Sequence, residues 1–147
     1  MEPVIKIKKT HAGALLPARA TEGAAAYDLS AALDSPVDIP PGQTALISTG
    51  IAIELPSPET VALVFSRSGI GIRNGIGLIN AVGVIDSDYR GTIQLGLINH
   101  SKQPFTVKSG DRIAQLVVMG VVPLPVVEVE ELSDTPRGAG GLGSTGI

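Results

Sequence analysis

The sequence lacks cysteine and tryptophan, and its 147 residues include only two phenylalanines and two tyrosines. Without cysteine, the chain has no disulfide scaffold, no thiolate metal site and no cysteine nucleophile. Because aromatic side chains are so few, Ile, Val, Leu and Ala must fill the core. The formal net charge of -3 at pH 7 also lacks the basic excess typical of duplex-binding proteins, so we expect no nucleic-acid partner.

Long apolar runs are missing as well. None approaches the ~20 residues that span a bilayer, so we expect no membrane partner. Residues 1–9 alternate apolar and charged side chains like a strand and lack the apolar segment of a secretory signal, which favours a cytoplasmic protein. The two histidines, His11 and His100, are too few for a histidine-rich zinc site.

Short stretches that alternate apolar and polar residues occupy much of the chain. They cover residues 4–8, 44–55, 61–65, 92–98 and 112–118, and turn-forming residues separate them. Only residues 21–32 and 68–75 could hold a helical turn. The pattern predicts a single all-β domain, a jelly-roll-like sandwich or barrel, over residues 1–132.

The C-terminal part of the chain suggests an oligomer. Residues 117–129 are almost continuously apolar, which predicts burial against another copy of the chain or, alternatively, a fully covered sandwich strand. Residues 133–147 include five glycines and cannot hold a fold by themselves, so we expect a flexible arm. Fully extended, residues 137–147 would reach roughly 35 Å, enough to cross a neighbouring subunit.

The arm contains residue types that bind phosphate. Its glycines formally fit the dinucleotide-binding spacing, but no helix can follow, and no lysine precedes Ser144 as a Walker A loop requires. A glycine-rich backbone still lets N–H groups approach an anion, and Arg137, Ser144 and Thr145 add donors. A phosphate clamp and a disordered chain end are both open at this point.

Residues 83–91 (GVIDSDYRG) hold the densest group of chemically active side chains. Two aspartates, a tyrosine and an arginine crowd into positions 86–90, whereas a hairpin made only for folding needs little more than Asn-Gly or Asp-Gly. Such side chains can accept a proton, hold the water shell of a cation, stack and bind phosphate. The alternative is a solvated hairpin tip.

Further polar residues could complete a nucleotide site. Residues 67–69 (RSG) follow the apolar stretch 61–65 and either present donors to an anion or form an ordinary turn. Gln115 lies inside an apolar run, so its amide needs a phosphate, a water or a backbone carbonyl as partner. Asp28 is a lone carboxylate among small residues, and the carboxylates of the chain in general favour a hard cation such as Mg²⁺. Asn80 either reads a base edge or caps a turn.

Taken in order, these segments resemble the five motifs of the trimeric dUTP diphosphatase (dUTPase) family. The matching segments are residues 25–29 (AAYDL), 67–69 with 74–76, 80 with 83–91, 110–116 (GDRIAQL) and 137–146. The resemblance covers essentially the whole chain and implies a jelly-roll-like homotrimer with three active sites at its subunit interfaces. It also implies Mg²⁺-dependent hydrolysis of dUTP to dUMP and pyrophosphate, which keeps uracil out of DNA and supplies dUMP for thymidylate synthesis.

The same resemblance implies roles for single residues. Asp86 would activate the water that attacks the α-phosphorus, and Asp28 would hold the metal through a water molecule. The base and sugar would be bound by Asn80, Gly83, Val84, Ile85, Tyr89 and Leu142. The phosphates would be bound by Arg67, Ser68, Gly69, Gln115, Arg137, Gly141, Gly143, Ser144 and Thr145.

Several positions depart from the family pattern. Ser66 stands where proline is usual, and Gly71 and Thr92 also differ from the commonest residues. Leu142 replaces a phenylalanine that stacks on the uracil. Because lost stacking costs about 1–3 kcal/mol per base, we expect a weaker arm clamp and a higher KM with intact chemistry.

Two other functions are alternatives to dUTP hydrolysis. A dCTP deaminase shares this fold, but residues 83–91 contain no glutamate to serve as its proton shuttle. A non-catalytic nucleotide-binding trimer would use the same residues only to hold its ligand.

Overall fold

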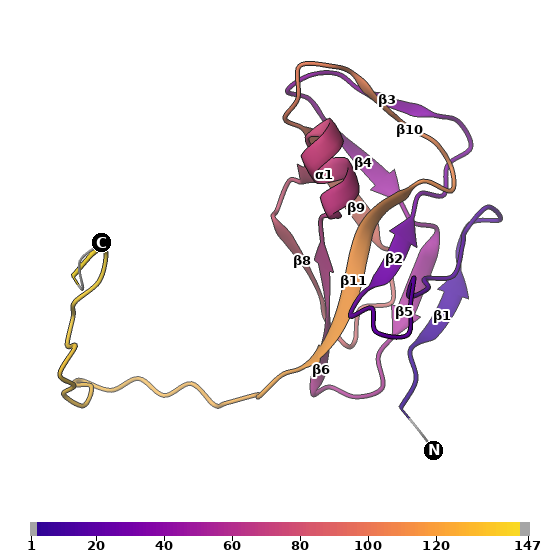
Figure 1. Cartoon of the computed structure of the whole chain (residues 1–147). Coiled ribbons are helices and arrows are strands. Elements are labelled where there is room, and N and C mark those ends of the chain that lie inside the picture. The colour runs from indigo at the N-terminus through magenta and orange to yellow at the C-terminus, as the bar shows by residue number, and fades with distance from the viewer. Residues whose placement is uncertain (1–2, 145–147) are drawn as a thin grey trace.

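The computed structural model describes residues 3–144, which form an all-β body and an extended C-terminal arm (Figure 1). The strands are β1 (Lys6–Lys9), β2 (Tyr27–Ser30), β3 (Val37–Ile39), β4 (Thr44–Ser48), β5 (Ile51–Glu54), β6 (Thr60–Phe65), β7 (Ile76–Leu78), β8 (Val82–Ile85), β9 (Gln94–Asn99), β10 (Phe105–Val107) and β11 (Arg112–Gly120). A seven-residue helix, α1 (Ser68–Asn74), lies between β6 and β7. Within the described residues, no helix is long and apolar enough to cross a bilayer.

The strands pair antiparallel in two larger sheets and two smaller ones. The larger sheets have the orders β2-β11-β6-β8 and β4-β9-β7, and the smaller ones pair β1 with β5 and β3 with β10. Along β9, every second residue is buried, as expected for a strand with one face on a core. The predicted all-β, jelly-roll-like fold is confirmed.

The core is aliphatic, as the composition predicts. Its fully buried aliphatic side chains include Leu29, Ile39, Ile47, Ile51, Val64, Ile76, Leu97, Val107, Ile113 and Leu116. One buried polar side chain, Asn99, donates hydrogen bonds to the carbonyl oxygens of Ile39 at 2.8 Å and Gln103 at 2.7 Å. Because a buried amide without partners would cost about 1–3 kcal/mol, these bonds let Asn99 join β9 to β3 inside the core.

Two regions differ from the elements that alternation alone predicts. Residues 44–55 form two strands, because Gly50 turns the chain with a φ of 65°, and a Cβ there would lie 2.7 Å from the Cβ of Ala32. Residues 21–32 form a turn and β2, with no α-helix, whereas residues 68–75 do contain α1.

The segment 83–91 also differs from the predicted hairpin. β8 pairs with β6 in the larger sheet, whereas β9 pairs with β4 and β7 in the other. The turn between β8 and β9 therefore crosses from one sheet to the other. This crossing leaves a space between the sheets that a two-stranded hairpin would have closed.

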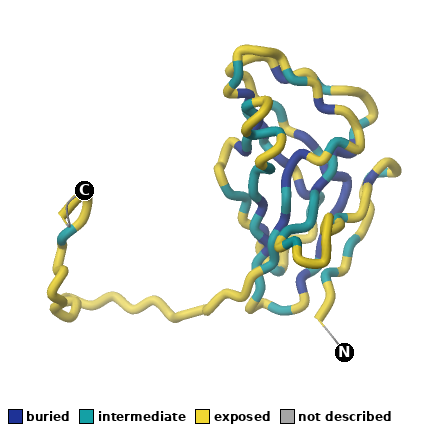
Figure 2. Tube along the Cα trace, in the orientation of Figure 1, coloured by how far each residue is buried: buried dark blue, intermediate teal, exposed yellow. Residues whose placement is uncertain are grey.

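Beyond Gly120 the chain runs away from the body and is exposed along most of its length (Figures 1 and 2). The apolar side chains of this segment are exposed to solvent as well, and Val126, for example, is 99% exposed. The apolar stretch 117–129 thus begins inside β11 and continues, from residue 121, without cover from its own chain.

Candidate active site

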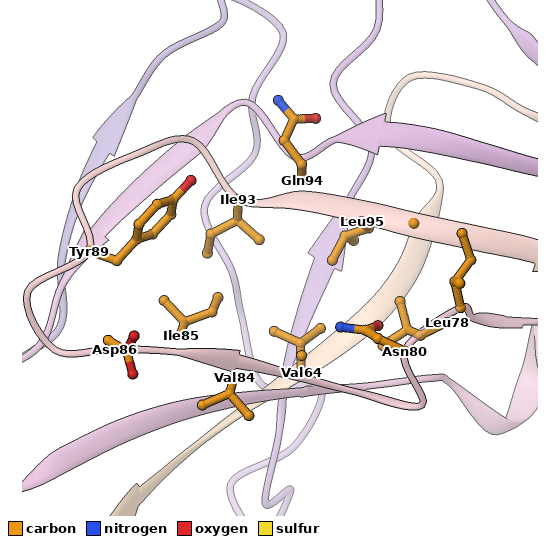
Figure 3. Close-up of a pocket in the computed structure, with 13 residues that line it drawn as sticks. Val64, Leu78, Asn80, Val84, Ile85, Asp86, Tyr89, Ile93, Gln94 and Leu95 are labelled. Atoms are coloured by element: carbon orange, nitrogen blue, oxygen red, sulfur yellow. The ribbon is translucent and has the colours of Figure 1, made fainter.

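A pocket of about 400 Å³ lies where the chain passes from β8 to β9 (Figure 3). It is lined by Val64, Leu78, Ile79, Asn80, Gly83, Val84, Ile85, Asp86, Tyr89, Ile93, Gln94, Leu95 and Gly96. Aliphatic side chains form much of its wall, with Asn80 near one end and Asp86 and Tyr89 near the other (Figure 3). An apolar pocket with a few placed polar groups is the usual form of a small-molecule site.

A tight turn holds Asn80 at its end of the pocket. Ala81 has a φ of 60°, a left-handed conformation that is uncommon for a residue with a side chain. The N–H of Val82 donates to the carbonyl oxygen of Asn80 at 2.6 Å. Strained backbone of this kind is concentrated at functional sites, and here it accompanies an amide side chain that lines the pocket.

Two glycines allow the strands and side chains of the pocket wall to pack as they do. A Cβ on Gly83 would lie 3.2 Å from the Cβ of Val64, so the glycine lets β8 pack closely on β6. A Cβ on Gly96 would lie 2.9 Å from Cδ1 of Ile79 and would push that side chain out of its place in the wall.

The turn after β8 carries Asp86 and Tyr89. The N–H of Tyr89 donates to the carbonyl oxygen of Asp86 at 3.1 Å. Arg90 donates through Nη1 to the carbonyl oxygens of Ser87 at 2.7 Å and Tyr89 at 3.1 Å, and so braces the turn. Asp86 is exposed at the mouth of the pocket, where a water molecule can reach its carboxylate.

A second, more polar pocket of about 290 Å³ lies near the meeting of β2, β6 and β11. It is lined by Ala20, Ala24, Ala25, Ala26, Asp28, Arg67, Ser68, Gly69 and Gln115. The strand register explains this grouping, because Gln115 pairs with Asp28 on one side and with Phe65, at the end of β6, on the other. Cross-strand partners are neighbours, so three segments far apart in the sequence supply one site.

Asp28 is the centre of an ion cluster in this second pocket. Its Oδ1 accepts from Nε of Arg67 at 2.8 Å, and its Oδ2 accepts from Nη1 of Arg112 at 3.0 Å. Arg67 also donates through Nη1 to the carbonyl oxygen of Arg112 at 3.1 Å. The side chains of Asp28 and Arg67 are only 18% and 23% exposed, so water screens this pair weakly.

Asp28, Arg67 and Arg112 together carry an excess of positive charge beside the pocket. One carboxylate lies between two guanidinium groups, next to the hydroxyl of Ser68 and the backbone of Gly69. Positive charge in a concave site attracts anions, and guanidinium groups match the geometry of phosphate oxygens. The second pocket is therefore suited to a phosphate group.

Gln115 has a backbone carbonyl as its partner, which was one of the open alternatives. Its Nε2 donates to the carbonyl oxygen of Ser66 at 2.9 Å. Ser66 also accepts, through Oγ, a hydrogen bond from the N–H of Leu78 at 2.9 Å. A proline at position 66 has no hydroxyl and could not make this bond, so Ser66 joins the end of β6 to β7 by a contact that proline would lack.

The predicted arm residues lie apart from both pockets in the single chain. Nε of Arg137 donates to the carbonyl oxygen of Gly140 at 2.9 Å, and Leu142 is fully exposed. The other predicted arm ligands within the described residues are Gly141, Gly143 and Ser144, which are exposed as well. Thr145 lies outside the described residues.

Sequence reasoning missed some residues in or beside the two pockets. Arg112, which binds Asp28 from just outside the second pocket, was part of a matching motif but had no role. Three residues before Gln115 on a regular strand it would point to the opposite face, and a shift of register between Arg112 and Ala114 is what brings it to Asp28. Ile79 and Ile93 gave no signal in the sequence. They are ordinary apolar residues, and they meet only because strands of different sheets enclose the pocket.

Fold and site together define a class of protein. A sandwich with one aliphatic pocket that ends in an amide, and a second, polar pocket lined by Arg67, Ser68 and Gly69, fits a ligand with a base-like part and an anionic part. The class is that of nucleotide-binding all-β proteins.

Comparison with known proteins identifies the family within this class. The dUTPase family model matches residues 13–146. The chain is 47% identical over 132 residues to the deoxyuridine 5'-triphosphate nucleotidohydrolase of Xanthomonas campestris pv. campestris, which covers 90% of this chain and 87% of the relative. It is 52% identical, with the same coverage, to the protein of that name from Desulfitobacterium hafniense. The chain therefore belongs to the dUTPase family, as the motifs predicted.

Solved structures agree with this assignment. The dUTPase of Staphylococcus bacteriophage 80alpha, solved with dUPNHPP, superposes with a TM-score of 0.89 at 26% sequence identity. The match covers 98% of this chain and 99% of the phage protein.

Proposed function

We propose that the protein hydrolyses dUTP to dUMP and pyrophosphate. The observation that carries this proposal is the pair of pockets in a dUTPase-family chain: an aliphatic one between Asn80 and Asp86, and a polar one around Arg67 and Ser68. A pyrimidine nucleoside needs the first and a triphosphate needs the second. The reaction keeps uracil out of DNA and supplies dUMP for thymidylate synthesis in the cytoplasm.

The aliphatic pocket binds the base and the sugar in this proposal. The amide of Asn80 and the backbone of Gly83, Val84 and Ile85 read the uracil edge. In this proposal the backbone of β8 leaves no room for the 5-methyl group of thymine. Tyr89 packs against the deoxyribose and leaves no room for a 2′-hydroxyl.

Asp86 is the proposed general base. Its carboxylate accepts a proton from a water molecule while the water oxygen forms a bond to the α-phosphorus. The bond from that phosphorus to the bridging oxygen breaks, and pyrophosphate leaves with the electron pair. A general base contributes about 10²–10⁴-fold, so positioning of the triphosphate must supply much of the remaining rate.

Arg67, Ser68, Gly69 and Gln115 hold the phosphates. Asp28 is the carboxylate of this pocket, and no group of three His, Cys, Asp or Glu side chains within residues 3–144 could form an all-protein metal cage. Because both oxygens of Asp28 already accept from Arg67 and Arg112, a metal here would be held mainly by waters and substrate phosphates, which is a usual arrangement for Mg²⁺. Asp28 would accept a hydrogen bond from a metal-bound water, and the ion would neutralise phosphate charge.

The proposed assembly is a homotrimer with shared sites. Exposed apolar side chains such as Val122, Val126 and Leu132 support burial of this segment on another copy. Residues 133–147 then act as a phosphate-clamping arm separate from the domain of residues 1–132, although the last strand ends at Gly120. Arg137, Gly141, Gly143, Ser144 and Thr145 close over the phosphates, and Leu142 covers the base.

The test is pyrophosphate release with Mg²⁺ from dUTP, dTTP, dCTP and UTP, measured in parallel. We expect release from dUTP alone. Ammonia release from dCTP would instead indicate a deaminase, and dUTP binding without any pyrophosphate would indicate a non-catalytic nucleotide-binding protein. Either result would overturn the proposal.

A further inference from the structure

The side chain of Tyr89 is folded back onto its own turn. Its hydroxyl donates to the carbonyl oxygen of Thr92 at 3.2 Å, three residues further along the chain. Between these two residues the ring passes over Gly91. In Figure 3 the ring lies at the end of the aliphatic pocket, next to Ile93.

The space for this ring exists because residue 91 has no side chain. A Cβ on Gly91 would lie 2.5 Å from Cζ and 3.0 Å from Cε2 of Tyr89, and closer still to the hydroxyl oxygen. The backbone of Gly91 does not have a positive φ, so its conformation alone would accept alanine. The glycine is therefore required by the ring.

The residues that contact the end of the Tyr89 ring are hydrogen-bonded to the body of the protein. Oγ1 of Thr92 shares a hydrogen bond of 2.8 Å with Oγ1 of Thr10, and the N–H of Thr10 donates to Gly50 at 2.7 Å. The N–H of Ile93 donates to the carbonyl oxygen of Ile51 at 2.9 Å. The carbonyl group that accepts from the Tyr89 hydroxyl thus belongs to a segment that is bonded to the body at Thr92 and Ile93.

We propose that Gly91 is a specificity-determining positioning residue. It seats the Tyr89 ring against the carbonyl of Thr92, and the seated ring rejects nucleotides that carry a 2′-hydroxyl. This inference rests on the proposed function, because it assigns to one glycine the discrimination between dUTP and UTP. Any side chain at position 91 would move the ring and loosen that discrimination.

The first test compares kcat/KM for dUTP and UTP in the wild type and in Gly91→Ala. We expect the preference for dUTP to fall by about tenfold or more, since small displacements of positioning groups have effects up to about 10²-fold. Gly23→Ala is the matched control, because a Cβ there meets no atom within 4 Å. An unchanged preference in Gly91→Ala would overturn the inference.

Tyrosine fluorescence gives a readout that does not depend on activity. The chain has no tryptophan and two tyrosines, so in a Tyr27→Phe background Tyr89 is the only strong fluorophore. In that background, Gly91→Ala should make Tyr89 more accessible to acrylamide quenching, whereas Gly23→Ala should leave it unchanged. Equal quenching in all three proteins would overturn the proposed seat.

A milder variant covers the case in which Gly91→Ala does not fold. Tyr89→Phe keeps the ring but removes the hydrogen bond to Thr92, and should lower the preference for dUTP by about two- to tenfold. An unchanged preference in this variant would count against the hydrogen-bonded seat. If the wild type hydrolyses no dUTP, the proposed function fails, and this differs from a wild type that is active but insensitive to both changes.

Discussion

The two aspartates assigned to the site differ in their surroundings. Asp28 is largely buried and has an arginine on each carboxylate oxygen, at 2.8 and 3.0 Å. Asp86 is exposed in a turn whose backbone is braced by Arg90. A carboxylate held by two guanidinium groups suits a binding role, whereas one open to water at the mouth of a pocket suits the activation of a water molecule.

Replacement of Asp86 by asparagine should abolish the proposed base with almost no change in shape. We expect kcat for dUTP to fall by about 10²–10⁴-fold while nucleotide binding is retained. Pyrophosphate release gives kcat, and calorimetric titration with a non-hydrolysable dUTP analogue gives affinity. Asp88→Asn is the control, since Asp88 is exposed on the same turn but does not line the pocket. Normal turnover in Asp86→Asn would mean that another group is the base.

Leu142 stands where the family usually has a phenylalanine, and restoring that phenylalanine should change substrate binding directly. Leu142→Phe adds an aromatic ring to the exposed arm, and stacking on the base contributes about 1–3 kcal/mol. KM for dUTP should therefore fall by about fivefold or more, with kcat nearly unchanged. Leu142→Ala should move KM the other way. If neither variant changes KM, the arm does not cover the base.

At the scale of strands, the sequence predicted the longer elements better than the short ones. β6, β9 and β11 each have six or more residues and show clear alternation, whereas β3, β7 and β10 have three residues each and were missed. Three residues hold too few alternating positions to stand out from a turn. The single strand expected over residues 44–55 failed for a different reason, since Gly50 interrupts an otherwise continuous pattern.

The same distinction applies to the candidate site. The polar lining of the proposed phosphate pocket was predictable because Asp28, Arg67 and Gln115 are polar residues in apolar or small-residue surroundings. The walls of the proposed base pocket were not, because they depend on which strands pair. β8 joins β6 and leaves β9 to the other sheet, and this partner choice has no local signal in residues 83–91.

The pairing of β1 with β5 predicts a pH-dependent contribution to stability. Lys6 and Glu54 are register partners and form an ion pair. The hydrogen bond and the charge of Lys6 hold the pKa of Glu54 below its ordinary value, and Arg90 makes a smaller contribution. A carboxyl group with a lowered pKa in the folded state stabilises the fold above its unfolded pKa, about 4.3 for glutamate. This stabilisation is lost as the pH falls through the lowered value.

Glu54→Gln should therefore unfold at a slightly lower urea concentration than the wild type at pH 7. The difference should shrink as the pH is lowered through the acidic range and vanish once the carboxyl group is protonated in both states. Glu59→Gln is the control, and protein concentration is held constant because assembly affects apparent stability. A difference that persists in acid would show that it does not come from the charge of Glu54.

At the scale of the whole molecule, a single chain presents only part of the proposed site. Its two pockets collect the proposed base-binding and phosphate-binding residues of the body, but Arg137 and Leu142 lie on an exposed arm that leaves the body after Gly120 (Figure 1). An extended arm with apolar side chains in water is costly for an isolated protein. A neighbouring copy would cover these side chains and receive the arm. Assembly of the chains would then both complete the site and bury the apolar segment.

Mixed assemblies test whether the arm acts on another subunit. One inactive partner carries Asp86→Asn with an intact arm, and the other has an intact Asp86 but ends at residue 132. Refolded together in equal amounts, they should regain pyrophosphate release, because some sites combine Asp86 of one chain with the arm of another. With random mixing, about one site in four meets both conditions, since two subunits are each chosen with even odds.

The controls for this experiment are the two variants refolded alone and a mixture assembled from separately folded proteins without exchange. Each should show only residual activity. Recovery toward a quarter of the wild-type rate would require an arm that crosses to a neighbouring subunit, because no single chain in the mixture has both parts. Failure to recover activity, with mixed trimers verified by mass spectrometry, would mean that each arm folds back onto the site of its own chain.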